Sequence, residues 1–213
     1  MRVAMFAGSL VVFALLGCAG KVDYVRPVSS VRQGENVKLI AKSRDAVWTT
    51  AVPELGKRFF VINNLDKASG LINLSYTGDP EKYIDCGRIT SYVKNARGER
   101  NYNFAASSAQ QSYEIMNPSV GLFAIDRRMS LEGRVNLIFE EVGPNETRVT
   151  ANTRYVVNRQ RVVRNIANNI PQTMNDSITF NSGGRASFPG SPDQSSECVA
   201  TGSLEREILE AIR

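Results

Sequence analysis

The sequence contains no histidine among its 213 residues. This absence excludes the Ser-His and Cys-His arrangements of nucleophilic catalysis and the zinc sites that use imidazole ligands. Asp85 beside Cys86, and Asp126 before Arg127, have no second convergent group at a spacing that suggests acid or base chemistry. The sequence therefore predicts a protein that is not an enzyme, with no catalytic residue, no metal site and no cofactor.

A strong excess of one charge is also missing. The chain has 26 Lys and Arg residues against 21 Asp and Glu residues, which gives a formal net charge of +5. Nucleic-acid-binding proteins carry a much denser basic stripe, so no nucleic acid is expected as a partner. The mild basic excess is compatible with anionic lipid headgroups or glycans.

The first 17 residues have Arg2 as their only charge, and a polar chain follows them. The large apolar residues of this segment include Phe6, Leu10, Val11, Val12, Phe13, Leu15 and Leu16. This run is too short to cross a bilayer comfortably as a helix, which takes about 20 apolar residues. Small residues close it, as they do in secretory signals. The sequence predicts a signal peptide over residues 1–17.

The end of this segment, Leu15-Leu16-Gly17-Cys18, resembles the lipobox of bacterial lipoproteins. The resemblance implies that the chain is cut before Cys18, whose sulfur carries diacylglycerol and whose amine is acylated. Several acyl chains on one residue hold a domain at a membrane durably. Ala19, in place of the aspartate that retains such proteins at the inner membrane, implies the outer membrane, with the domain facing the periplasm. The alternative is a secreted protein with an unrelated cysteine near its cleavage site.

Cysteine is scarce, with three residues in all. If Cys18 is lipidated, Cys86 and Cys198 remain as an even pair in an oxidising compartment, where disulfides form and persist. We predict a disulfide between them, and two free buried thiols are the alternative. Neither cysteine is a candidate nucleophile, because no histidine is present to activate it.

The chain after the signal peptide divides into a tether and one domain. Residues 18–36 carry Pro27, Gly34 and polar side chains without a sustained period. They predict a lipidated N-terminus followed by a flexible tether. Residues 37–213 are enough for a single domain, which the export signal places in the periplasm.

Alternating patterns predict strands in much of this domain. They occur in residues 37–42, 58–76, around 96–99, and 129–157 with a turn at 143–146. Residues 181–196 are rich in Ser, Gly and Pro and predict a loop. No pattern assigns residues 107–128 and 161–175.

Two helices are expected beside these strands. The first begins near Ala46 and ends at Gly56, kinked or shortened by Pro53. The second begins after Gly202, with Ser203 as its cap. A helix, antiparallel strands and a closing helix in this order predict an α+β layer fold.

The segment Leu39 to Pro80, LIAKSRDAVWTTAVPELGKRFFVINNLDKASGLINLSYTGDP, resembles the opening of the helix-grip domain in BamC-type outer-membrane lipoproteins. The shared pattern is a strand, a helix with Trp48 facing inward, a strand, a turn with Gly70, and a strand ending near Tyr76. The resemblance implies an α+β helix-grip fold and an accessory role in assembling β-barrels in the outer membrane. This chain departs from the family in three respects: it has a single such domain, a long central segment and the cysteine pair.

Basic residues gather at two places in the sequence. The first group surrounds one predicted hairpin, and the second lies at the end of another strand: Arg88, Lys94, Arg97 and Arg100; Arg154, Arg159, Arg161 and Arg164. We predict that they contact lipid phosphates, lipopolysaccharide or an acidic partner surface. Ordinary solvated charge is the alternative. The apolar run from Val120 to Ile125 is either a core strand or a partner-binding patch.

The predicted function is that of a non-enzymatic, lipid-anchored envelope protein that binds another envelope protein during outer-membrane assembly or maintenance. The sequence also leaves a second class of function possible, that of a ligand carrier. A helix-grip sheet can curl around its helix and leave a cavity, so a carrier of a lipid or small apolar ligand is the alternative.

Overall fold

A computed structural model describes residues 18–28, 35–190 and 196–213 of the chain, and the predicted signal peptide lies outside them. The structure is 61% strand and 14% helical, and its sheets are mostly antiparallel. The predicted α+β helix-grip class is therefore wrong, because the fold is predominantly β. Both expected helices are present, but segments without an assigned pattern turn out to be strands.

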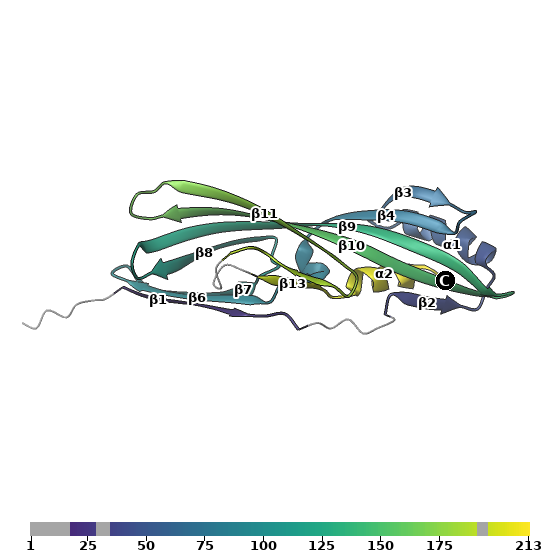
Figure 1. Ribbon diagram of the computed structural model, residues 1–213, viewed down its shortest axis with the longest axis horizontal. Helices are drawn as coiled ribbons and strands as arrows, with labels where there is room; N and C mark the ends of the chain where they lie inside the picture. Colours follow the sequence, from purple (N-terminus) through teal and green to yellow (C-terminus); the bar gives the residue numbers. More distant parts are fainter. Residues whose placement is uncertain (1–17, 29–34, 191–195) are drawn as a thin grey trace, which may run out of the picture.

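A long hairpin runs along most of the elongated molecule (Figure 1). Its strands are β9 (Gly121–Gly143) and β10 (Glu146–Asn165), which have 23 and 20 residues. The turn between them lies where the sequence predicted it, but both strands extend well beyond the predicted hairpin. From Thr147, opposite Glu141, to Asn165, opposite Phe123, the pairing continues without a shift.

Buried arginines explain why the full length of this hairpin was not predicted. Alternate residues of β9 and β10 face the interior, as they must in a strand. Three of these inward positions are occupied by Arg127, Arg159 and Arg161, which are all buried. The alternation of apolar and polar residues that reveals a strand is therefore lost in this part of the chain.

The half of the hairpin near its turn forms what we call the helical end (Figure 1). Strands β4 and β3 extend the sheet beyond β9, and β2 pairs with β10. Both helices pack against this half, and the ring of Trp48 lies 5.3 Å from that of Phe139. Pro53 lies inside α1 but does not shorten it. The elements are β2 (Val37–Ile40), α1 (Arg44–Gly56), β3 (Val61–Asp66), β4 (Leu71–Gly78) and α2 (Ser203–Ala211).

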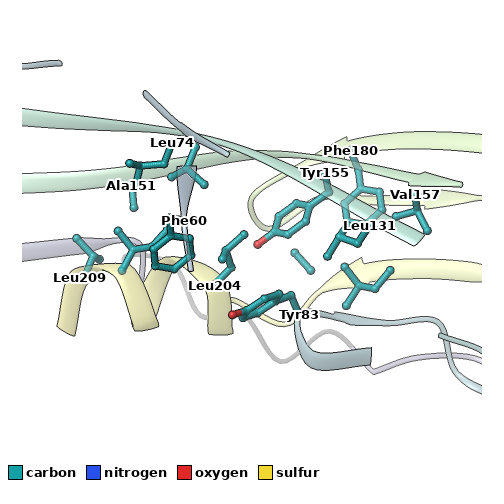
Figure 2. Close-up of a cluster of buried hydrophobic side chains, with 14 of the residues drawn as sticks. Phe60, Leu74, Tyr83, Leu131, Ala151, Tyr155, Val157, Phe180, Leu204 and Leu209 are labelled. Atoms are coloured by element: carbon teal, nitrogen blue, oxygen red, sulfur yellow. The ribbon is translucent and has the colours of Figure 1, made fainter. Parts of the chain in front are cut away.

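The core of the helical end lies between α2 and the sheet. Figure 2 shows Leu204 and Leu209 pointing from α2 toward the sheet that carries Leu74 and Ala151. Gly202, with φ 73°, holds the N-cap position, so the prediction that Ser203 caps this helix is wrong. Glycine adopts this left-handed conformation without the strain that a side chain causes.

The other half of the hairpin forms the sandwich end. Here β8 pairs with β9 and β11 pairs with β10, and a second sheet in the order β1-β6-β7 lies against β8. A small sheet in the order β12-β13-β5 completes the fold. The elements are β1 (Ala19–Val25), η1 (Pro80–Lys82), β5 (Ile84–Asp85), β6 (Arg88–Asn95), β7 (Gly98–Ala105), β8 (Gln110–Asn117), β11 (Pro171–Asn181), β12 (Arg185–Ser187) and β13 (Glu197–Ala200).

Most of the described part of the predicted tether is a strand. Residues 19–25 form β1, which pairs with β6 over its whole length. Gly20 lies so close to β8 that an added Cβ would stand 2.3 Å from the Cβ of Met116, so no side chain fits there. The hydroxyl of Tyr24 accepts a hydrogen bond from the Glu197 N–H at 2.8 Å. The prediction of a flexible tether is therefore wrong for residues 19–25, since the folded body begins directly after Cys18.

Candidate functional site

Cys18 lies exposed immediately before β1, at the outer end of the sandwich end. The pairing of Ala19 with Lys94 places it beside the turn between β6 and β7. The turn between β8 and β9 lies against the turn between β10 and β11, because the Ile166 N–H donates a hydrogen bond to the Leu122 carbonyl at 2.9 Å. We call this surface the tip and define it as residues 18–19, 95–98, 116–122 and 165–170.

A pocket of about 460 Å³ lies between these segments, with Cys18 in its wall. Its apolar walls come from Met116, Leu122 and Ile166. The apolar run that begins at Val120 is divided by the structure. Val120 is exposed at the turn, whereas Ile125 is buried in β9.

The first predicted basic group does not form one surface. Arg88 donates to the side chain of Asn103, and Arg100 forms an ion pair with Glu114 on β8. Lys94 lies 2.6 Å from Glu99, and the hydrogen bond between them raises the pKa of Lys94 and lowers the pKa of Glu99. Arg97 lies in the turn between β6 and β7, where it belongs to the tip.

The second predicted basic group is divided between the two faces of β10. Residues 154 and 164 face the opposite side of the sheet from residues 159 and 161, because side chains alternate along a strand. Arg159 and Arg161 are buried. The prediction that all four contact an anionic partner at the surface is therefore wrong for these two.

The buried pair is compensated by Asp176 on β11. Its Oδ2 lies 2.8 Å from Nη2 of Arg159 and 3.3 Å from Nη2 of Arg161. Arg159 also donates to the Pro189 carbonyl and stands 4.3 Å from the centre of the Phe188 ring. Burial lowers the pKa of Arg159, and the hydrogen bond to Asp176 opposes this change.

Arg127 lies opposite Arg161 on β9 and is 1% exposed. Neither of its terminal nitrogens has a hydrogen-bond partner among the residues that the structure describes. Burial lowers the pKa of Arg127 to about 10, and the charges of Arg159 and Arg161 act in the same direction. Its guanidinium remains charged at neutral pH. A buried charge without a partner lowers the stability of the folded state.

Replacing Arg127 with methionine is therefore expected to raise the free energy of unfolding. Methionine has a similar length and adapts to irregular space, so the substitution removes the charge and keeps the packing. The expected gain is about 1–4 kcal/mol, measured by urea denaturation. Arg128→Met, at the neighbouring exposed position, is the control and should change the stability by less than about 0.5 kcal/mol. A loss of stability in Arg127→Met would show that the guanidinium has a favourable partner.

The predicted disulfide between Cys86 and Cys198 is confirmed, with their Cα atoms 4.0 Å apart. The pairing of β5 with β13 brings the two segments together. This bridge leaves Cys18 as a free thiol. Cys18 is therefore available for the modification that the lipobox resemblance implies.

A second hollow, of about 840 Å³, crosses β8, β9, β10 and β11. Most of the residues around it have polar side chains, among them Gln110, Arg128, Asn158, Gln160 and Asn175. No group of three or more His, Cys, Asp or Glu residues that could hold a metal ion occurs in residues 18–28, 35–190 and 196–213.

Within the same described ranges, none of the helices has both the length and the apolar character needed to cross a membrane.

Sequence reasoning singled out Cys18, Arg97 and the apolar run from Val120 separately, but it did not bring them together in one site. Val120 is in a turn between Pro118 and Gly121, and Ile170 directly precedes Pro171. A large aliphatic residue beside such turn-forming residues is the only local indication of exposure. That two turns and Cys18 meet at one place depends on the tertiary fold.

Comparisons with known proteins do not assign this chain to a family. No protein-family model, no curated protein and no solved structure matches it. The interpretation of the tip therefore depends on its own chemistry.

Proposed function

We propose that the protein is a non-enzymatic lipoprotein of the bacterial cell envelope, anchored in the outer membrane by acyl chains on Cys18, with its body in the periplasm. The observation that supports this most is the position of Cys18. It is exposed at one end of the elongated body, and the paired strand β1 begins one residue later. Acyl chains on its sulfur and amine reach a bilayer without unfolding any strand.

The proposed role is to bind another envelope protein during outer-membrane assembly or maintenance. The helical end lies far from the tip along the body (Figure 1). Strand β3 ends the sheet there, and Phe59 and Val61 are exposed beside that edge. A free strand edge with apolar side chains is a surface to which a partner can add a strand.

The Cys18→Ser variant tests the anchor. Cells that produce the wild type are expected to incorporate labelled palmitate into the protein, whereas the variant incorporates none. With residues 1–17 replaced by a cleavable secretory signal, the variant is expected in the soluble periplasmic extract after a high-salt wash of the membranes. The wild type should stay in the membrane fraction, because several acyl chains give durable binding.

A Cys86→Ser/Cys198→Ser double variant is the control for the loss of a cysteine as such. It should still incorporate palmitate and stay with the membranes. Incorporation of palmitate into Cys18→Ser would contradict the proposed anchor.

A further inference from the structure

We propose that the tip is a membrane-docking surface whose apolar side chains enter the bilayer that holds the acyl chains of Cys18. The orientation depends on the proposed function, because the anchor selects the membrane. The surface itself belongs to the folded body, so its affinity for lipid can be measured without acyl chains.

The apolar part of the surface consists of Val120, Ile166 and Ile170. Val120 is 57% exposed and Ile170 is 62% exposed, although both are large aliphatic residues. The turns that carry them are held together, since the Asn165 side chain donates to the Val120 carbonyl at 3.4 Å. Transfer of such side chains out of water is favourable by up to about 1.5–3 kcal/mol each. At a bilayer interface, all three side chains can leave water together.

The charges of the tip suit a membrane with anionic headgroups. The segments that define it contain Arg97 and no Asp or Glu residue. A basic side chain near an anionic surface contributes about 1 kcal/mol of attraction. Five asparagines in these segments supply amide groups that can hydrogen-bond to headgroups, namely Asn95, Asn117, Asn165, Asn168 and Asn169.

Cys18 lies within the tip, so its acyl chains and the apolar side chains of the tip would enter the same membrane. Its side chain shares a pocket with Met116, Leu122 and Ile166, so the first atoms of the attached lipid lie against apolar walls. Docking through the tip directs the long axis of the molecule away from the membrane and leaves the helical end free (Figure 1). A protein partner at the tip would instead compete with the acyl chains for the same space.

The test uses mature protein that begins at residue 18, carries Cys18→Ser, and has no acyl chain. Its co-sedimentation is measured with vesicles of phosphatidylethanolamine and phosphatidylglycerol at low salt. The body with an intact tip is expected to bind these vesicles. Adding Val120→Asp and Ile170→Asp is expected to weaken the partition coefficient at least tenfold. Circular dichroism checks that the exposed substitutions leave the fold intact.

Val61→Asp in the same unacylated protein is the matched control, because Val61 is 61% exposed but lies at the helical end. It should bind vesicles as well as the parent does. Absence of binding by the parent, or equal losses in the Val61 variant and the tip variant, would overturn the docking surface. Palmitate labelling of Cys18 decides the anchor separately, so failure of either proposal can be recognised.

Discussion

Replacing Asp176 with alanine is expected to lower the free energy of unfolding by about 3–5 kcal/mol. Its carboxylate accepts hydrogen bonds from Arg159 and Arg161, whose side chains are almost fully buried. The substitution removes a negative charge that compensates two guanidinium groups in the interior. For a domain of this size such a loss corresponds to a fall in melting temperature of about 10 °C, measured by differential scanning calorimetry.

Two further variants show whether the loss comes from charge compensation. Asp176→Asn keeps the shape of the side chain and should destabilise the protein by a smaller amount. Glu140→Ala removes a carboxylate that lies 3.9 Å from Arg148 at the surface of the same sheet. It should change the stability by less than about 0.5 kcal/mol. If Asp176→Ala lost no more than this control, the buried ion pairs would contribute little.

Loss of the disulfide is expected to lower the free energy of unfolding by about 2–5 kcal/mol. Cys86 and Cys198 are 112 residues apart, so the bridge closes a loop that includes the whole of the long hairpin. It also fixes β13, which leads into α2, to β5. Because α2 has only nine residues, it is marginal without such support. A Cys86→Ala/Cys198→Ala variant should therefore unfold at a lower urea concentration and temperature than the wild type.

Mass mapping of non-reduced peptides should find the two cysteines in one crosslinked pair. A reductant should lower the melting temperature of the wild type and leave that of the double variant unchanged. Cys18→Ser, which leaves the bridge intact, should keep the wild-type melting temperature. Alkylation of both thiols in protein prepared without reductant would rule out this stabilisation.

Much of the local structure at the helical end could be predicted from the sequence. Trp48 and its neighbours follow a helical period, and the turn at Pro144 separates two alternating segments. Strand β1 could not be recognised in the same way. Its residues are mostly exposed, and its pairing with β6 comes from a distant part of the chain. Local patterns do not contain such a partner.

The candidate site, too, could be predicted only where local sequence patterns were sufficient. The disulfide was predicted from a count of cysteines and from the expected export of the chain to an oxidising compartment, and it is present. The division of Arg154 and Arg159 between opposite faces of β10 could have been derived from their odd and even positions. The convergence of Val120 and Ile170 near Cys18 could not, because exposure at a shared end depends on how three hairpins pack.

The unshifted pairing between β9 and β10 limits how the length of the protein can change. With the turn at Pro144 held in place, deleting one residue from the middle of β9 would turn every earlier side chain of the strand to the opposite face. Asp126 would then take the buried position of Arg127, and Arg127 would become exposed. A change in length that preserves both faces must remove or add two residues in each strand together. The distance from Cys18 to the helices can therefore be adjusted only in increments of about 7 Å.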